Sequence, residues 1–600
     1  MEQETHSTSS GQAKTCQNCK NQFAIEPDDF AFYEKIKVPP PTWCPECRAM
    51  RRFMWRNERT LWKTTSDATG KQIFSMFPPG EFEVYEHNYW FSDKWDAIEF
   101  GKNYDFSKTF FAQLKELMHD VPWFNASLIN AVNSEYTNHT IDIKNCYLSF
   151  DIGYDEDCAY ITGTHHTKNS LDLDSCTYLE RSAHNFYCHN SYGIFYSSGC
   201  EYCNDVWFSR DCIGCSFCFG CVGLRNKSYY IFNKAYSKED YFKELEKFNL
   251  GSAAELMGLK QKVKSFWSTF PVKSMQGSRN TDVSGDYIYN CKNVKNSFWV
   301  QGAEDCKYLQ SDSYPTTNNS YDLCIAGVGT ELCYDSHGIG VGASEVKFTW
   351  MSYPNCSRIS YCMNCHDVSD CFGCIGLRNK QYCIFNKQYT KKEYEELLPQ
   401  IIQHMNSMPY VDSKGRSWRY GEFFPTDLSP FGYNETVALE YFPLTREKVI
   451  EQGFSWRDSE ERSYNVTMKA TDIPEHIDGV SESILKETIQ CAHEGGCKER
   501  CTTAFRLVPQ ELELYKERRI ALPRLCSNCR HAERLLERNP LQFWHRSCQC
   551  GGIKSENSIY SNQTEHFHGS HHCPNNFETT FAPDRAEIVY CEQCYQAEVS

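Results

Sequence analysis

The spacing of the cysteines constrains this chain more than any other feature. Four of its 34 cysteines form two CxxC pairs near the amino terminus, at Cys16, Cys19, Cys44 and Cys47. Four thiolates at these spacings can close a tetrahedron around Zn²⁺, and a site with four protein ligands leaves no open position for a substrate. The pattern therefore predicts a small module folded around a structural zinc ion, in preference to four buried free thiols.

A second copy of this module lies near the carboxyl terminus. An offset of 482 residues maps three of the four cysteines, a Phe–Pro–Tyr series and a series of arginines onto identical residues. The three cysteine pairs are Cys19 and Cys501, Cys44 and Cys526, and Cys47 and Cys529. We predict that Cys497 takes the place of Cys16, in a knuckle one residue longer, and that Cys491 is left over or competes for the metal.

A third zinc site is predicted in the last fifty residues. Cys591 and Cys594 form a CxxC knuckle, and Cys573 precedes Phe577 by four residues, as Cys19 precedes Phe23. The CxxC partner of Cys573 is missing, so a distant residue must complete the site. We favour Cys550 for this role; the alternatives are Cys548, His566, His568, His571 and His572. The chain is thus expected to hold about three structural zinc ions.

Arginines recur every four residues after the second knuckle of each repeated module. They are Arg48, Arg52 and Arg56 in the first module and Arg530, Arg534 and Arg538 in the second. This spacing places each set on one face of a helix that starts at the metal. A knuckle, an extended segment and a helix that carries the last two ligands make a treble-clef-like module, whose small core depends on zinc for stability.

The stretch CQNCKNQFAIEPDDFAFYEKIKVPPPTWCPECRAMRR resembles the probable zinc-ribbon (treble-clef) domains of bacterial proteins. The chain as a whole is similar to an uncharacterised multi-zinc-ribbon family of uncultured small-genome bacteria. Stretches such as WRNERTLWK, FGCVGLRNKSYYIFN and APDRAEIVYCEQCYQAEV carry this resemblance. It implies the zinc modules and their order, and no particular activity.

The middle of the chain contains a different repeat, with an offset of 153 residues. FGCVGLRNKSYYIFNKAYSKEDY begins at Phe219, and FGCIGLRNKQYCIFNKQYTKKEY begins at Phe372. Each copy ends in a capping box and an amphipathic helix. About a hundred residues of short Tyr/Phe/Ile/Val/Cys segments, separated by Asn, Asp, Gly and Ser, precede each copy. This pattern predicts a mainly β fold, a duplicated parallel β-helix closed by helical caps, with a pair of β-sandwiches as the alternative.

Twenty cysteines lie in this middle region. The run Cys212, Cys215, Cys218 and Cys221 is similar to an iron–sulfur motif. However, the 153-residue offset maps Cys215 onto Val368, so one slot is apolar in the second copy. Because free cysteine is among the most buried residue types, we favour a ladder of buried thiols over a metal site.

These observations predict a sequence of segments along the chain. They are a disordered tail (1–13), zinc module 1 (14–65), a helical linker (66–130), solenoid half 1 with its closing helix (131–270), solenoid half 2 with its closing helix (271–410), a connecting segment (411–490), zinc module 2 (491–546) and zinc module 3 (547–600).

Charge and hydropathy limit the functional class. The net charge is −16, and no apolar run is long enough to cross a membrane. The polar amino terminus shows no secretory signal, so we expect a cytoplasmic protein with reduced thiols. The zinc ends are locally basic: residues 1–65 carry 10 Lys/Arg against 8 Asp/Glu, and residues 497–546 carry 11 against 6.

We therefore favour a non-enzymatic binding or scaffold protein. The arginine stripes allow contact with nucleic acid or ribonucleoprotein, but pairing of these arginines with the acidic body of the chain is the favoured explanation. One alternative is a β-helix enzyme acting on polysaccharide, with Asp172 and Asp174 as an acid–base pair. The other is a redox sensor that works through its thiols or metals. The sequence shows no nucleophile motif, P-loop or dinucleotide fingerprint.

Overall fold

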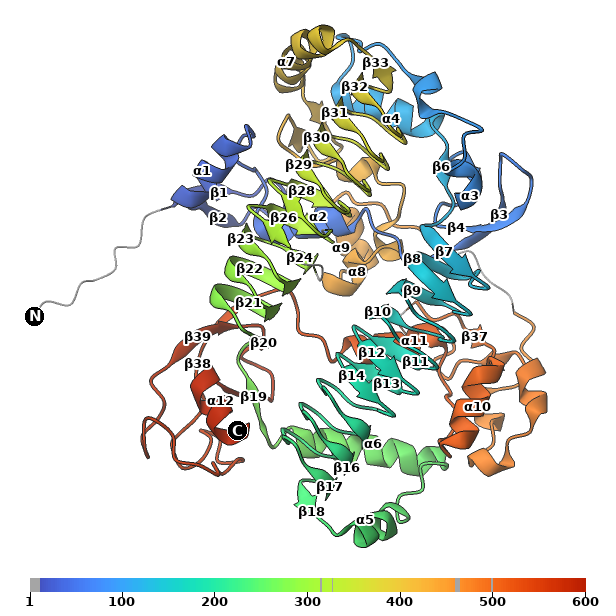
Figure 1. Ribbon diagram of the computed structural model, residues 1–600, viewed down its shortest axis with the longest axis vertical. Coiled ribbons are helices and arrows are strands. Elements are labelled where there is room, and N and C mark those ends of the chain that lie inside the picture. Colours follow the sequence, from blue (N-terminus) through green and yellow to red (C-terminus); the bar gives the residue numbers. More distant parts are fainter. Residues whose placement is uncertain (1–10, 313–315, 326, 459–463, 498–499, 600) are drawn as a thin grey trace, which may run out of the picture. The chain divides into compact units, whose positions relative to one another are not determined.

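The computed structural model describes residues 11–312, 316–325, 327–458, 464–497 and 500–599. It is mainly β, with parallel β-solenoids and zinc-ribbon-like cysteine modules at both ends of the chain, which confirms the predicted fold class (Figure 1). The chain divides into two compact units. Unit 1 comprises Met1–Ala126, Met275–Asp458 and Pro540–Gln542, and unit 2 comprises Ser127–Ser274, Ser459–Asn539 and Phe543–Ser600. The amino-terminal module therefore belongs with the second solenoid, and the carboxyl-terminal modules belong with the first.

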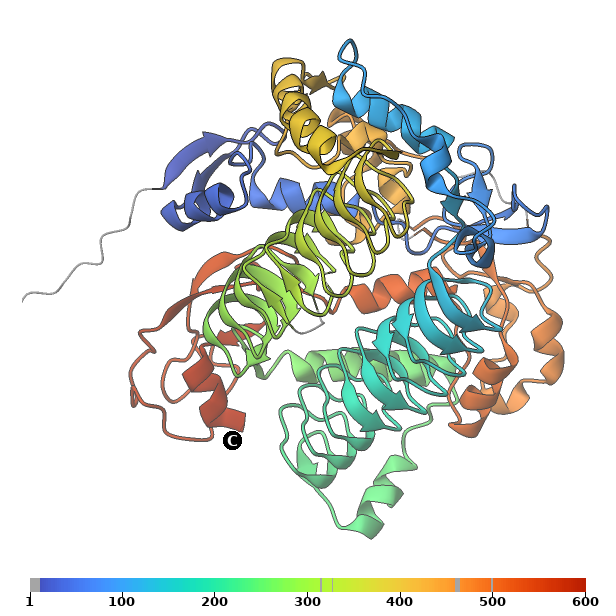
Figure 2. The ribbon, with the colours of Figure 1, turned by 45° about the horizontal axis from the view of Figure 1, so that its top comes forward.

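The first solenoid, in unit 2, is a regular parallel stack. Leu128 pairs with Thr140 and Thr137 with Ser149, so each turn advances by twelve residues. Its strands are β7 (Leu128–Val132), β8 (Thr137–Lys144), β9 (Ser149–Gly153), β10 (Thr162–His165), β11 (Leu171–Asp174), β12 (Thr177–Glu180), β13 (Ala183–Phe186), β14 (His189–Tyr192), β15 (Asn204–Trp207), β16 (Ser216–Phe219), β17 (Ser228–Ile231) and β18 (Lys234–Ala235). The stacked turns are visible in Figure 2.

A three-residue pattern explains this geometry. From His139 to Phe232, every third residue has a positive φ, and many of these residues are Asn, Asp or Gly. These residue types tolerate the left-handed region best, so each one turns the chain at modest cost. The next residue points inward: Cys146 follows Asn145 and Cys158 follows Asp157, and both thiols are buried.

The second solenoid, in unit 1, repeats this architecture less regularly. Successive turns advance by 14 residues from Lys307 to Tyr321, by 13 to Tyr334 and by 12 from Ser357 to Ser369. Its strands are β20 (Gly277–Ser278), β21 (Thr281–Tyr289), β22 (Lys292–Gln301), β23 (Glu304–Lys307), β24 (Gln310–Asp312), β25 (Thr317–Asn318), β26 (Tyr321–Cys324), β27 (Thr330–Glu331), β28 (Tyr334–His337), β29 (Ser344–Lys347), β30 (Ser357–Ser360), β31 (Ser369–Phe372), β32 (Gln381–Ile384) and β33 (Lys387–Gln388).

Helices close both solenoids, as the capping boxes predicted. Ser237 accepts a hydrogen bond from the Asp240 N–H at the start of α5 (Lys238–Leu245), and Thr390 accepts one from the Glu393 N–H at the start of α7 (Lys391–Ser407). Besides short 3-10 helices, the remaining α-helices and strands outside the metal modules are β3 (Trp62–Thr65), β4 (Gln72–Ser75), β5 (Val84–Tyr85), α3 (His87–Trp90), α4 (Phe110–Asp120), β6 (Trp123–Phe124), α6 (Ala253–Trp267), β19 (Pro271–Lys273), β34 (Tyr410–Val411), β35 (Ser417–Trp418), α8 (Ala438–Tyr441) and α9 (Arg446–Glu451).

The two modules related by the 482-residue repeat have the same elements. Module 1 contains β1 (Gln12–Thr15), β2 (Gln22–Ile25), α1 (Pro27–Lys35) and α2 (Pro45–Phe53). Module 2 contains β36 (Ile489–Gln490), β37 (Ala504–Phe505), α10 (Pro509–Glu517) and α11 (Ser527–Leu535). Module 3 contains β38 (Trp544–Ser547), β39 (Asn576–Thr579), β40 (Ile588–Tyr590) and α12 (Glu592–Val599). Of the expected disordered tail, residues 1–10 lie outside the described residues, and β1 already begins at Gln12.

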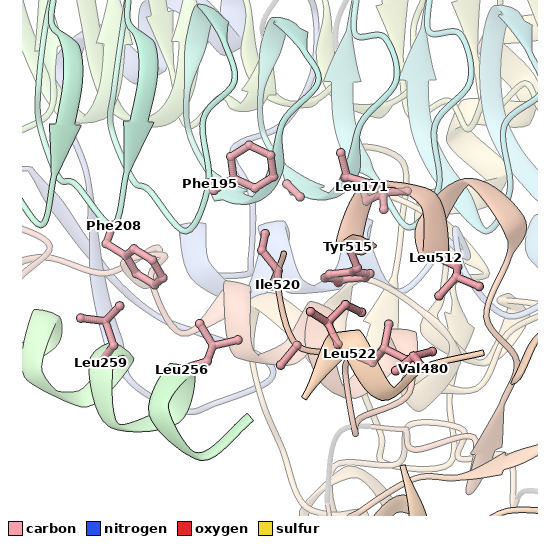
Figure 3. Packing of buried hydrophobic residues seen from close by; sticks show 14 of the residues in the cluster. Leu171, Phe195, Phe208, Leu256, Leu259, Val480, Leu512, Tyr515, Ile520 and Leu522 are labelled. Carbon is pink, nitrogen blue, oxygen red and sulfur yellow. The ribbon is translucent and has the colours of Figure 1, made fainter. Parts of the chain in front are cut away.

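A shared apolar core joins module 2 to its solenoid within unit 2. Side chains of the solenoid wall face side chains of α6, α10 and the segment after α10 (Figure 3). Members of this cluster include Leu171, Phe195, Phe208, Leu256, Leu259, Leu512, Tyr515, Ile520 and Leu522. Tyr515 is 1% exposed. The module is thus part of the unit's hydrophobic core, and its cysteines are held at a defined place on the solenoid.

Candidate metal centres

Module 1 brings its four predicted cysteines together. Cys16 follows β1, Cys19 lies in the turn before β2, and Cys44 and Cys47 lie at the start of α2. Their four Sγ atoms lie within 4.8 Å of one another, and the Cys44 N–H donates to the Cys16 sulfur at 3.3 Å. The Cys44 and Cys47 thiols lower the pKa of Cys16 through hydrogen bonds to its sulfur.

Module 2 assembles a set that differs from the predicted one. Cys491, Cys501, Cys526 and Cys529 form the four-cysteine group, whereas Cys497 lies in a second group with His493 and Cys529. The hairpin register gives the reason. Ile489 pairs with Phe505 as Lys14 pairs with Phe23, so Cys491 occupies the place of Cys16. The Cys526 N–H also donates to the Cys491 sulfur at 3.3 Å, which repeats the contact in module 1.

Module 3 follows the same plan. Arg546 pairs with Phe577, which places Cys548 at the position of Cys16, and the Cys591 N–H donates to the Cys548 sulfur at 3.2 Å. Cys548, Cys573, Cys591 and Cys594 form the four-cysteine group. The favoured ligand, Cys550, lies instead in a separate group with His566, His568 and Cys594.

The first cysteine of the four-cysteine groups in modules 2 and 3 could not be found by CxxC spacing, because long segments replace the two-residue knuckle. In module 1 two residues separate the first two ligands, whereas the corresponding segments run from Cys491 to Cys501 and from Cys548 to Cys573. A usable signal existed in the strand that precedes the first ligand. In each module this cysteine directly follows a short β-strand whose partner strand carries the phenylalanine.

The distances between sulfurs fit a tetrahedral metal. With Zn–S bonds of about 2.3 Å, the sulfurs of a regular tetrahedron lie about 3.8 Å apart. The Sγ separations are 3.7 Å for Cys19 and Cys44, 3.9 Å for Cys501 and Cys526, and 3.8 Å for Cys573 and Cys591. A disulfide would need about 2.05 Å. Each of the three groups of four cysteines found among the described residues therefore suits a thiophilic cation. Four sulfur ligands would leave such a cation no coordination position for a substrate.

Two of the three arginines predicted to form a stripe in module 1, Arg48 and Arg52, point into the second solenoid, whereas Arg56 pairs with Glu58. Arg48 pairs with Asp322 at 2.9 Å, and Arg52 pairs with Asp322 at 3.2 Å and with Asp335 at 2.8 Å. Arg51, outside the predicted four-residue series, pairs with Asp335 at 2.6 Å and with Glu422 at 2.8 Å, and the side chains of Arg48, Arg51 and Arg52 are at most 1% exposed. Helix α2 therefore positions the last two cysteines of the group at its start and a buried charge network along its length.

Module 2 repeats this arrangement on the first solenoid. Arg530 and Arg534 pair with Asp172 at 3.2 and 2.7 Å, and Arg530 also pairs with Glu511 at 2.9 Å. Burial alone would raise the pKa of Asp172, but the two guanidinium groups lower it, so the carboxylate stays ionised. Asp172 is the second residue of β11, just as Asp322 is the second residue of β26.

The arginines at these four positions pair with carboxylates of the chain itself, as the sequence analysis favoured. Arg48, Arg52, Arg530 and Arg534 are buried against solenoid carboxylates and are not available to phosphate groups. Asp172, one member of the suggested acid–base pair, is fully buried and takes part in this ion-pair network. Asp174 is 3% exposed and lies 3.5 Å from His531.

The middle cysteines line the interior of the solenoids. All twenty are buried, and no metal-binding group found among the described residues includes any of them. Most of their thiols face backbone carbonyl oxygens of their own turn, and many also face one of the next turn; the Cys203 sulfur, for example, lies 3.3 Å from the Glu201 and Cys212 oxygens. Burial raises the pKa of Cys176 to about 12. These features agree with the predicted thiol ladder.

Two of the pockets among the described residues have a volume of about 370 Å³, one in each unit. Neither is lined by a histidine or a serine. The lining of the unit 2 pocket includes one thiol, that of Cys146, whose pKa burial raises to about 12. These pockets do not present an activated nucleophile.

Comparison of the chain with protein-family models and with curated proteins found no match. Within the described part of the chain, no helix is both long and apolar enough to cross a membrane.

Proposed function

We propose that this chain is a non-enzymatic binding or scaffold protein whose structural Zn²⁺ ions hold its terminal modules on two β-solenoids. One observation carries the proposal. The helix that presents the last two thiolates of a module also presents the arginines that enter the solenoid: Cys44 and Cys47 with Arg48 and Arg52 in α2. A metal at the start of the helix would fix its position and so the register of the buried ion pairs.

Zinc is the cation that suits these groups best. Closed sets of four thiolates are typical of structural zinc, and the sulfur separations match its tetrahedral geometry. The hairpin followed by a helix with two ligands supports a treble-clef topology for each module. Metal–thiolate chemistry and buried free thiols both require reduced cysteine, so we propose that the protein works in the cytoplasm.

The binding role is proposed for the exposed faces of the solenoids. Along the first solenoid, Tyr154, His166 and Tyr178 stack with ring centroids 4.7 and 4.5 Å apart. Tyr154 and Tyr178 are 48% and 55% exposed. A ladder of exposed rings on the solenoid wall supports recognition of a partner surface. Among the described residues, no contact favours the polysaccharide enzyme or the redox sensor over this role.

Metal analysis of the full-length protein, followed by chelation, tests this proposal. We expect at least three zinc ions per chain and no iron. Removal of zinc by a strong chelator should lower the melting temperature and expose the arginine helices to proteolysis, because zinc contributes on the order of 10 kcal/mol to such modules. A metal-free protein with an unchanged melting temperature would contradict it.

A further inference from the structure

The long knuckle of module 3 carries metal ligands of its own. The segment between Cys548 and Cys573 contains Cys550, His566 and His568, and it places them beside Cys594. One ligand atom from each of these four residues lies within 4.8 Å of the others. Cys594 is also a member of the four-cysteine group of the module, so the two groups share one thiol.

Both histidines are oriented as metal ligands usually are. His566 Nε2 lies 2.8 Å from the Glu598 carboxylate, and its Nδ1 faces the Cys550 sulfur at 3.2 Å. His568 Nδ1 donates to the His571 carbonyl oxygen at 2.7 Å, and its Nε2 faces the Cys594 sulfur at 3.2 Å. Since each ring uses one nitrogen on an oxygen acceptor, the lone pair of its other nitrogen is directed toward the thiol cluster.

Burial and charge also fit a second cation. Cys550 and Cys594 are 0% exposed and His566 is 4% exposed, whereas His568 is partly open to solvent. One divalent ion on four thiolates leaves a net charge of −2, and an ionised Cys550 beside it would make this −3. A second divalent ion reduces the total to −1, which makes five thiolates in one small core far less costly.

In module 2, the segment inserted between the first two cysteines also brings additional potential metal ligands to the four-cysteine group. Its long knuckle brings His493 and Cys497 next to Cys529, which corresponds to Cys594. Module 1 has only a two-residue knuckle, and the four-cysteine group is the only such group among its described residues. The additional ligands therefore accompany the inserted segment.

We propose that module 3 holds two metal ions, with a second Zn²⁺ bound by Cys550, His566, His568 and a Cys594 thiolate that bridges to the first. This inference rests on the proposed zinc of the four-cysteine group. The second ion has a mixed S₂N₂ ligand set, and it is the more labile of the two, because its bridging thiolate is shared and His568 is open to solvent.

Metal counting on the full-length protein and matched histidine variants tests this site. The wild type should carry at least four zinc ions per chain by native mass spectrometry and elemental analysis. His566→Ala and His568→Ala should each lose one ion. His571→Ala is the control, because its exposed side chain belongs to no metal group and only its backbone oxygen orients His568; it should keep the wild-type count.

X-ray absorption on the wild-type zinc protein gives a readout that does not depend on whether the variants fold. We expect a nitrogen shell near 2.0 Å from the two histidines, in addition to sulfur near 2.3 Å, and a short metal–metal vector. Three ions with a sulfur-only shell, or a count unchanged in both histidine variants, would overturn the second ion and leave the structural zinc proposal standing. A protein without bound metal would refute both.

Discussion

Arg534 of module 2 donates to Asp172 of the first solenoid at 2.7 Å, and both side chains lie in the buried interior of unit 2. The residue that corresponds to Arg534 in module 1, Arg52, pairs with Asp322 at the same position of its own strand. The same contact, between an arginine of a module helix and an aspartate of a solenoid strand, therefore occurs twice in the chain. In each case the module and the solenoid that it contacts are separated by more than two hundred residues of sequence.

Breaking this contact should destabilise unit 2. Arg534→Met leaves Asp172 with a single guanidinium partner in a dry interior, and a buried pair broken on one side typically costs about 3–5 kcal/mol. We expect a loss of about 3 kcal/mol in the free energy of unfolding, measured by denaturant titration. The double variant with Asp172→Asn should lose less than the sum of the single variants, because the two residues form one network.

Arg519→Met is the matched control in the same unit. Arg519 is paired with Asp478 at 2.9 Å, but its side chain is 70% exposed. Exposed pairs contribute little, so a change of about 0.5 kcal/mol or less is expected. Equal losses in the two variants would show that the buried network is not what holds module 2 on the solenoid.

The metal ligands of module 2 can be assigned by a pair of cysteine variants. Cys491 occupies the place of Cys16 in the hairpin, whereas Cys497 lies outside the four-cysteine group. Cys491→Ser should therefore lower the zinc content by one ion and lower the melting temperature. Cys497→Ser should retain the ions of all three four-cysteine groups, as counted by native mass spectrometry. The reverse result would restore the assignment based on sequence spacing.

Much of the architecture could be predicted from the sequence because it repeats. The 482-residue offset aligned helices α1 and α2 with α10 and α11 end to end, and the 153-residue offset aligned β16 and β17 with β31 and β32. The three-residue turn pattern was present but missed. In the first solenoid every inward cysteine follows a residue with positive φ, as Cys203 follows Tyr202. Tyr and His at several of these positions hid the pattern, since they are not typical turn residues.

The parts that could not be predicted depend on contacts between distant segments. Spacing named Cys491 and Cys548 only as alternatives, because the inserted segments separate them from the other cysteines of their groups and only strand pairing brings them together. Likewise, the spacing of the arginines indicated that they share one helix face. Their partners could not be predicted, because the short strands that contain Asp172 and Asp322 have no sequence feature that distinguishes them from the other strands of the solenoids. The sequence around Asp172 was therefore compatible with a catalytic acid, and only the structure shows that it pairs with Arg530 and Arg534.

The thiol ladder makes a prediction that separates it from an iron–sulfur site. Val368 stands in the second solenoid where Cys215 stands in the first, and both are buried beside a residue with positive φ. Cys215→Val should therefore keep the wild-type metal content and lower the free energy of unfolding by only about 1–3 kcal/mol, because valine is one methyl group larger than cysteine and otherwise apolar. Loss of a metal from this variant, detected by elemental analysis, would mean that the middle thiols bind one.

A buried carboxyl group should make the stability of unit 2 depend on pH. Asp155 is 1% exposed, and burial raises its pKa to about 7, although Thr164 and the Thr167 N–H donate to it. Between the unfolded pKa, about 4, and this value, the folded state holds a proton that the unfolded state has lost. The stabilising contribution of Asp155 is therefore fully present below about pH 4 and is lost as pH rises through 7, a change on the order of 4 kcal/mol.

Asp155→Asn removes this titration while it keeps an acceptor for the Thr167 N–H. Asn185 already makes the equivalent contact elsewhere in the first solenoid, since it accepts from the Ser197 N–H at 3.0 Å. We expect the variant to be more stable than wild type at pH 8 and about equal to it near pH 4, as measured by denaturant titration across this range. Asp155→Ala, which leaves the Thr167 N–H without its acceptor, should be less stable than Asp155→Asn at both pH values. An Asp155→Asn variant with the same pH profile as wild type would show that Asp155 is ionised at no cost within the solenoid wall.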